Sequence, residues 1–218
     1  MIKIKKFVFN PFAENTFILW DEGTLEAAVI DPGCFNETEE LELKNFIDTQ
    51  KLNVKHLLNT HCHIDHILGC NFISKEYSPV YSVPELDIPL LSVGSQQASA
   101  FGIKLKEPLK PDVLLNEESE ITIGKNKAKI LFTPGHTPGE ICFYFKESKI
   151  LIAGDVLFQG SIGRTDLWGG DLRTLLNSIQ TKLLTLPGNT IVFPGHGSET
   201  TIDEEKTYNP FLNNDELG

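Results

Sequence analysis

The sequence has few of the features that mark a membrane protein, a nucleic-acid-binding protein or a disulfide-rich secreted protein. No apolar run approaches the length of about 20 residues that spans a bilayer. The chain has 19 basic and 30 acidic residues, a net charge of −11. This balance disfavours binding to a polyanion such as a nucleic acid. Its four cysteines contain no CxxC pair, which favours small buried side chains in a reducing compartment. We therefore expect a cytoplasmic protein that binds neither membranes nor nucleic acids.

The chain also lacks a Pro/Ser-rich linker, a low-complexity tract and any sharp change in composition, so residues 1–218 are expected to form one domain. Apolar and alternating patterns predict strands over residues 2–9, 16–20, 25–30, 54–59, 127–132, 141–145, 149–153 and 190–193. Helical spacing predicts helices over residues 37–51 and 171–186, a helix start near Asp65, and helix within residues 84–102, where Pro89 and Gly94 weaken the pattern. Two groups of strands followed by helices indicate two packed sheets with helices outside them.

The densest cluster of chemically active residues is His61-Cys62-His63-Ile64-Asp65-His66. In an extended stretch, residues i and i+2 face the same side, so His61 and His63 can bind one metal ion. A helix that starts just afterwards would turn Asp65 and His66 toward a neighbouring position. The pattern HxHxDH has odds of only about 2 in 10,000 in a random chain of this composition, so it indicates a metal site. Cys62 falls between two ligands and is expected to point away from them.

Three further donors follow strand-like runs that end in Gly or Pro-Gly, namely His136, Asp155 and His196. Loops that leave such strands would bring these donors together if the strand ends share one edge. With the four donors of the cluster, seven candidate ligands exceed the four that one tetrahedral zinc takes, whereas two metal ions that share a carboxylate use all seven. Nitrogen and oxygen donors suit zinc, iron or manganese. His56 lies within a predicted strand, outside this pattern, and is expected to be structural.

These motifs resemble the metallo-β-lactamase-fold hydrolase superfamily: THCHIDH at residues 60–66, TPGHTPG around His136, AGD ending at Asp155 and PGHG around His196. The resemblance extends from VIDPG at residues 29–33 to NPF at residues 209–211. It implies an α+β fold, a four-layer αββα sandwich of two mixed sheets with the metal site at one sheet edge. The ligand set that it implies has His61, His63 and His136 on the first metal and Asp65, His66 and His196 on the second, with Asp155 bridging the two.

Within the superfamily, FQGSIGRTD at residues 158–166 and TIDEEKTYNPF at residues 201–211 resemble short single-domain members of the glyoxalase II group, the hydroxyacylglutathione hydrolases. Full glyoxalase II enzymes have a further C-terminal helical domain that helps to bind glutathione, and this chain is too short to include one. In those enzymes tyrosines contact glutathione, and Ser198 and Asp166 stand at the corresponding positions here. The resemblance therefore does not identify the thiol of the substrate. Arg164 keeps a basic charge that could bind a substrate carboxylate. A structural ion pair between Arg164 and Asp166 is the alternative.

Other branches of the superfamily fit less well. True β-lactamases lack a bridging aspartate, the di-iron flavoprotein branch has Glu at the position of His63 together with a flavin domain, and the nuclease branch generally adds domains or a basic surface. The nearest rival is the persulfide dioxygenase group, which shares the motifs but uses a single iron that would map onto His61, His136 and Asp155. A metal-binding module without catalysis is a third alternative.

The resemblance to glyoxalase II thus implies a binuclear hydrolase that cleaves a small acyl thioester with a metal-bridging hydroxide. Asp65, which would both bind metal and orient the hydroxide, and Asp155 are the expected catalytic carboxylates. The expected cofactors are two divalent metal ions, zinc ahead of iron or manganese. A homodimer would be unsurprising for this group.

Overall fold

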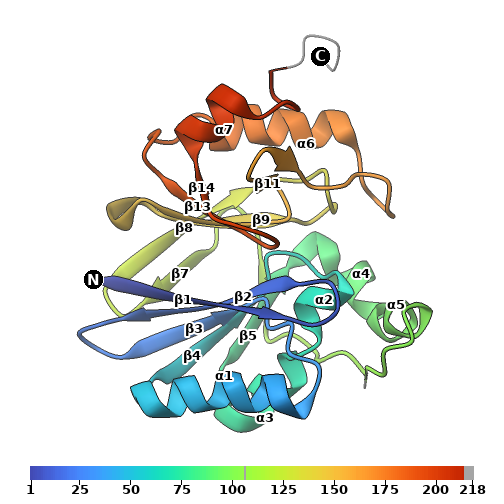
Figure 1. Cartoon of the computed structure of the whole chain (residues 1–218). Helices are drawn as coiled ribbons and strands as arrows, with labels where there is room; N and C mark the ends of the chain where they lie inside the picture. The colour runs from blue at the N-terminus through green and yellow to red at the C-terminus, as the bar shows by residue number, and fades with distance from the viewer. Residues whose placement is uncertain (106, 214–218) are drawn as a thin grey trace. The chain divides into compact units, whose positions relative to one another are not determined.

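The strands form two six-stranded mixed sheets and a two-stranded ribbon in the computed structural model, which describes residues 1–105 and 107–213 (Figure 1). Contacts divide the chain into two units, one of residues 1–115 and 122–126 and one of residues 116–121 and 127 onward. Each unit holds one of the six-stranded sheets, apart from the tip of one hairpin. The predicted α+β class with two mixed sheets is confirmed, whereas the one-domain organisation stays a prediction.

The sheet of the first unit has the order β1-β2-β3-β4-β5-β6, antiparallel from β1 to β3 and parallel from β3 to β6. Its strands are β1 (Ile2–Phe9), β2 (Glu14–Asp21), β3 (Glu26–Ile30), β4 (Asn53–Leu58), β5 (Val80–Pro84) and β6 (Val113–Leu115). Helices α1 (Glu37–Gln50) and α3 (Cys70–Tyr77) cover one face of this sheet (Figure 1). Leu43 and Ile47 of α1 join Val29 and Leu57 of the strands in the apolar core.

Shorter helices connect the parallel strands of the first unit. They are α2 (Ile64–Ile67), α4 (Ile88–Ser92) and α5 (Gly94–Ala100), and a 3-10 turn at Glu85–Asp87 precedes α4. Helix α2 follows β4 after a loop of five residues, which places the predicted donor cluster at the end of a parallel strand. The helical stretch predicted between residues 84 and 102 exists, and it breaks at Val93, directly before Gly94.

The sheet of the second unit has the order β14-β13-β10-β9-β8-β7. Its strands are β7 (Glu120–Ile123), β8 (Asn126–Phe132), β9 (Ile141–Phe145), β10 (Ile150–Gly154), β13 (Ile191–Pro194) and β14 (Thr200–Thr201), and the ribbon consists of β11 (Leu157–Phe158) and β12 (Ser161–Ile162). Strands β9 and β10 are antiparallel, which confirms the predicted hairpin, whereas β10 and β13 are parallel. Helices α6 (Leu172–Ser178) and α7 (Ile202–Tyr208) lie over one face of this sheet (Figure 1).

Several elements differ from the sequence-based expectation. The helix predicted over residues 171–186 ends early, because α6 passes into a π-helical turn at Ile179–Leu183 and the chain leaves the helix there. Strands β5, β6 and β7 and helices α3 and α7 were not predicted. The strands among them have at most five residues, so their sheet partners decide their conformation more than their own pattern does. Of the helices in the described residues, none combines the length and the apolar character needed to cross a membrane.

Candidate metal centre

Four of the predicted donors lie in the first unit, on the segment that joins β4 to α2. His61 and His63 are in the loop, and Asp65 and His66 are in α2. His63 has extended backbone angles (φ −66°, ψ 153°), as the argument from residues i and i+2 requires. The ring centroid of His61 is 4.9 Å from that of His63 and 4.1 Å from that of His66, and His66 Nε2 is 3.7 Å from Asp65 Oδ2. One short segment of the chain therefore brings the four donors close together.

Asp31, which follows β3, fixes the proton position on His61 through Thr60 and also lies close to His66. Its Oδ1 accepts the Thr60 N–H at 2.8 Å, and its Oδ2 accepts the Thr60 hydroxyl at 2.6 Å. Because the Thr60 hydroxyl donates to Asp31, its oxygen accepts from His61 Nδ1, which is 3.1 Å away. His66 Nδ1 lies 3.3 Å from Asp31 Oδ2. The His61 ring thus carries a proton on Nδ1 and keeps the Nε2 lone pair for a metal ion.

Two more buried carboxylates lie behind the donor segment. Glu14 Oε1 is 4.0 Å from His66 Nδ1, and Glu14 Oε2 accepts the Thr16 hydroxyl at 2.8 Å. Burial raises the pKa of Glu14 well above its usual range, although the neighbouring His66 opposes that shift. Asp87 Oδ2 accepts the backbone N–H of Cys62 at 3.0 Å, so it holds the chain between His61 and His63.

The Cys62 side chain lies in the apolar core of the first unit. Burial raises the pKa of its thiol, and only a thiolate binds metal. This agrees with the prediction that Cys62 points away from the ligands. All four cysteines are buried and carry free thiols, as predicted, and His56 Nε2 lies 3.0 Å from the Thr122 carbonyl oxygen, in the structural role expected of it.

The other three donors lie in the second unit, each directly after or close to the end of a strand. His136 follows β8, Asp155 follows β10 and His196 follows β13. The Gly195 N–H donates to the Gly154 carbonyl at 2.7 Å, which holds the ends of the parallel strands β10 and β13 together. Asp155 Oδ2 is 3.6 Å from His136 Nε2 and 3.5 Å from His196 Nε2. The carboxylate therefore lies within reach of both imidazoles, in keeping with the bridging role predicted for it.

The backbone fixes the tautomer of His136. Its Nδ1 is 2.7 Å from the carbonyl oxygen of Arg164. A carbonyl oxygen only accepts hydrogen bonds, so Nδ1 carries the proton and Nε2 presents its lone pair near Asp155. Asp155 is held as well, since Glu140 Oε1 accepts its backbone N–H at 2.6 Å and Glu140 is fully buried.

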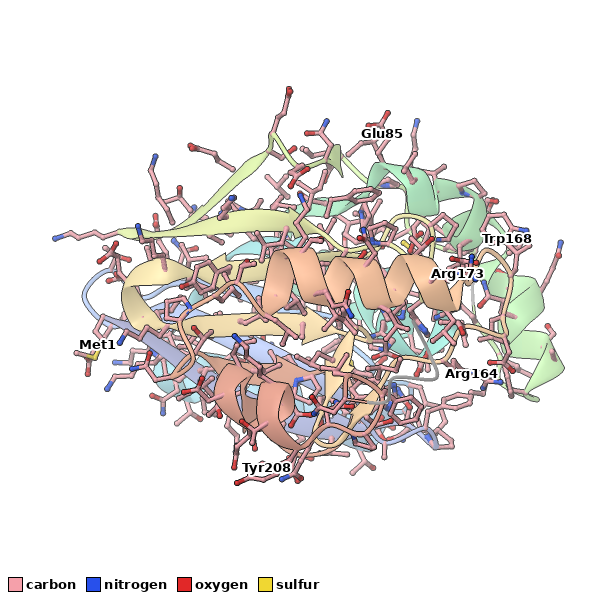
Figure 2. All side chains as sticks on the ribbon, turned by 90° about the horizontal axis from the view of Figure 1, so that it is seen from above. Met1, Glu85, Arg164, Trp168, Arg173 and Tyr208 are labelled. Carbon is pink, nitrogen blue, oxygen red and sulfur yellow. The ribbon has the colours of Figure 1, made fainter. Side chains whose placement is uncertain are left out.

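The side chain of Arg164 forms the ion pair with Asp166 that was the alternative to substrate binding. Nε and Nη2 of Arg164 each donate to Asp166 at 2.8 Å, and both side chains are largely exposed. The Arg164 guanidinium holds the pKa of the Asp166 carboxyl down, at about 2. Figure 2 shows Arg164, Trp168 and Arg173 at one end of this unit, where α6 begins. Arg164 thus touches a predicted donor through its backbone, while its side chain faces solvent.

The chemistry of these donors fits divalent transition-metal ions. The set consists of imidazole nitrogens and carboxylate oxygens, which suit zinc, iron and manganese. His61 and His136 present Nε2, because the Nδ1 of His61 donates to a hydroxyl and the Nδ1 of His136 donates to a carbonyl oxygen. Histidines that bind metal in proteins are held in this way.

Sequence reasoning missed the carboxylates behind the donors. Asp31 stands in the VIDPG run that carries the resemblance, but no role was assigned to it. Asp87 and Glu140 belong to no recognisable pattern, and they lie 25 and 15 residues from the amides that they accept. Only the fold identifies them.

Known proteins of similar sequence and structure identify the family of this chain. A family model described as the metallo-beta-lactamase superfamily matches residues 9–196. The hydroxyacylglutathione hydrolase GloC of Haemophilus influenzae is 43% identical over 204 residues, which are 93% of this chain and 94% of that protein. The crystal structure of the BLEG-1 B3 metallo-beta-lactamase has 36% identity and a TM-score of 0.87, covering 97% of this chain and 100% of its own. The crystal structure of TTHA1623 in a di-iron-bound form has 34% identity and a TM-score of 0.85, covering 95% and 100%. The chain therefore belongs to the metallo-beta-lactamase superfamily, shares its fold and is a metal-dependent hydrolase of that superfamily.

Proposed function

We propose that this protein is a binuclear metal-dependent hydrolase of small acyl thioesters, of the glyoxalase II type. The observation that carries the proposal is the 43% identity to a hydroxyacylglutathione hydrolase over 93% of the chain. In the proposal, His61, His63 and His136 bind the first metal, Asp65, His66 and His196 bind the second, and Asp155 bridges them. Zinc is expected first, and the di-iron-bound form of TTHA1623 supports iron as the alternative.

When bound, two such cations bring the pKa of a shared water to about 7 and polarise a carbonyl oxygen. The chain supplies orientation. Asp65, whose Oδ2 lies 3.7 Å from His66 Nε2, accepts a hydrogen bond from the attacking water and aims its lone pair at the carbonyl carbon. The water loses one proton to solvent, and attack by the resulting hydroxide forms a C–O bond and breaks the C–S bond. The immediate products are a carboxylic acid and a thiolate, and proton transfer between them gives a carboxylate and a thiol. A thiol has a pKa of about 8.5, so the thiolate leaves without a general acid from the protein.

For substrate binding, we propose that Arg164 contacts a carboxylate of the substrate. The pair of Arg164 and Asp166 is exposed and screened by solvent, so a substrate carboxylate can replace Asp166 on the guanidinium. Ser198 and Asp166 stand where glutathione-binding enzymes of the group have tyrosines. A screen of acyl thioesters that differ in their thiol, with lactoylglutathione as the first compound, would therefore identify the thiol of the natural substrate.

The test is metal content and hydrolysis in protein purified without added metal. We expect about two zinc, iron or manganese ions per chain and hydrolysis of lactoylglutathione or another acyl thioester. Asp155→Ala should lower kcat/KM by orders of magnitude, because both imidazoles near Asp155 Oδ2 lose their shared partner. Asp48→Ala is the matched control, since it removes an exposed carboxylate from α1 and should leave the rate unchanged.

Other results would reassign the protein. A single iron with oxygen uptake on persulfides would make it a dioxygenase. Hydrolysis of β-lactams without hydrolysis of thioesters would place it with the B3 enzyme that it resembles at 36% identity. Retained thioester hydrolysis in folded Asp155→Ala would contradict the bridging role.

A further inference from the structure

A buried pair of residues near the C-terminal end of the described chain binds the turn of the β11–β12 ribbon. Glu205 of α7 is buried, and its Oε2 accepts the Gly160 N–H at 2.9 Å and Asn209 Nδ2 at 2.7 Å. Asn209 is fully buried, and its Nδ2 also donates to the Ser161 carbonyl at 2.9 Å. Glu205 Oε1 accepts the Thr200 hydroxyl at 2.6 Å. We call Glu205 and Asn209 the α7 clamp.

Leu157 and Ile162 anchor the base of the ribbon in the apolar core of the second unit, whereas its turn is held by polar contacts. Its register pairs Leu157 with Ile162 and Phe158 with Ser161, so residues 159 and 160 form a two-residue loop. Gly160 has φ +65°, in the left-handed region that a tight hairpin turn requires. A two-stranded ribbon is marginally stable on its own, so hydrogen bonds from outside decide whether it persists. The α7 clamp supplies them at both Gly160 and Ser161.

The ribbon leads directly to the atom that holds His136. After β12, the Gly163 N–H donates to the Val156 carbonyl at 3.3 Å. A Cβ on Gly163 would lie 1.8 Å from the Asp155 carbonyl oxygen, so the chain passes tightly against the backbone of Asp155. The carbonyl of the next residue, Arg164, is the acceptor for His136 Nδ1 at 2.7 Å. The position of that carbonyl therefore depends on the ribbon, and the ribbon depends on the clamp.

We propose that Glu205 and Asn209 are positioning residues for His136, because they hold the ribbon so that the Arg164 carbonyl fixes the proton on Nδ1. If the carbonyl moves away, the His136 ring is free to carry its proton on Nε2 instead, and a protonated Nε2 cannot bind a metal ion. The inference rests on the proposed role of His136 as a ligand. It gives the TIDEEKTYNPF run, which contains none of the seven proposed metal ligands, a role in the site.

The disrupting variants are Glu205→Leu, which removes every bond of the carboxylate, and Asn209→Ala, which removes the bond to Ser161. Glu205→Gln is the conservative variant, because its oxygen can accept from Gly160 while its amide donates to the Thr200 hydroxyl. Thr207→Ala is the matched control on the same helix, since its exposed hydroxyl donates to the Asp203 carbonyl at 2.7 Å, within the helix itself.

Three measurements follow the chain of contacts in full-length protein. Amide hydrogen exchange at Gly160 reports the ribbon, ¹⁵N NMR of the His136 ring in metal-free protein reports its tautomer, and transfer of zinc to a chelator reports metal retention. We expect Glu205→Leu and Asn209→Ala to exchange Gly160 faster, to mix the two tautomers and to lose zinc roughly 10-fold faster or more. Glu205→Gln and Thr207→Ala should stay close to the unsubstituted protein.

A folded Glu205→Leu or Asn209→Ala variant that keeps one His136 tautomer and releases zinc at the unsubstituted rate would overturn the inference. Failure of both disrupting variants to fold, with no rescue by Glu205→Gln, would also overturn it, because the clamp would then be needed for folding alone. Unsubstituted protein that binds no metal would refute the proposed function, a result seen before any variant is made, and the role of the clamp would fall with it.

Discussion

At the scale of single residues, buried carboxylates hold the donor segments by accepting backbone amides. Asp31 accepts from Thr60, Asp87 from Cys62 and Glu140 from Asp155, at 2.8, 3.0 and 2.6 Å. Each of the three carboxylates is fully buried. Hydrogen bonds to a charged acceptor are about twice as strong as neutral ones. The donors are therefore held through the main chain next to them, which leaves their side chains available for metal.

Glu140 offers a direct test of this arrangement. Glu140→Leu leaves the Asp155 N–H buried without its acceptor, which should lower the free energy of unfolding by about 1–3 kcal/mol. Glu140→Gln keeps an acceptor oxygen and should cost less than half as much. Urea unfolding of the metal-free variants measures both values. Equal losses for the two substitutions would show that the hydrogen bond to Asp155 contributes little.

The seven proposed donors stand out in the sequence by their motifs, whereas the groups that hold their segments do not. His61, His63, Asp65 and His66 form one short motif, and His136 and His196 each stand in a PGH turn. Asp87 lies in a run without any proposed donor, and Glu140 lies just after the TPGHTPG run but was assigned no role there. Their role arises from contacts across 25 and 15 residues, which only the folded chain brings about.

At the scale of elements, helix α6 packs directly on the turn that carries His136. Gly135 has φ +133°, and a Cβ there would lie 2.3 Å from the backbone nitrogen of Leu175 in α6. The Asp171 N–H donates to the Gly135 carbonyl at 2.8 Å, and the Ser178 hydroxyl donates to the Pro134 carbonyl at 2.7 Å. The length of this helix was overestimated from its leucine spacing, because a π-helical turn at Ile179–Leu183 leaves no trace in apolar periodicity.

Gly135→Ala should therefore be strongly destabilising. The strained backbone costs about 1–3 kcal/mol and the overlap with α6 a further 1–3 kcal/mol or so. For a chain of this length each kcal/mol lowers Tm by about 2–4 °C. Gly102→Ala is the matched control, since Gly102 also has positive φ (+71°) but nothing lies within 4 Å of its Cβ position. A thermal scan that gives both variants the same Tm would mean that α6 yields easily at this contact.

At the scale of the whole molecule, each unit holds part of the donor set, four residues in the first and three in the second. The strand-to-loop pattern of both parts could be predicted from the sequence, because each donor follows an apolar run. The short strands β11, β12 and β14, of two residues each, could not, since two residues carry no periodicity. The chain carries a net charge of −11, to which bound cations would add positive charge.

Metal removal should lower the stability of the whole chain. A metal ion at 100 times its Kd stabilises the native state by about 2.7 kcal/mol, which corresponds to a change in Tm of about 5–10 °C. We expect dialysis against a chelator to lower Tm by this amount and added zinc to restore it. His56→Ala should show the same shift, because His56 is not a donor, whereas Asp155→Ala should show a smaller one. An identical shift in Asp155→Ala would place the stabilising metal elsewhere.

The contact between His136 Nδ1 and the Arg164 carbonyl separates two tasks within one loop. The ring is held by a main-chain atom, which every amino acid possesses, whereas the side chains of Arg164, Asp166 and Trp168 are exposed. The loop can therefore exchange those side chains for others while the histidine keeps its tautomer. Substitutions in this loop, in evolution or in a library of variants, can therefore change substrate binding and leave the proposed hydrolytic centre unchanged.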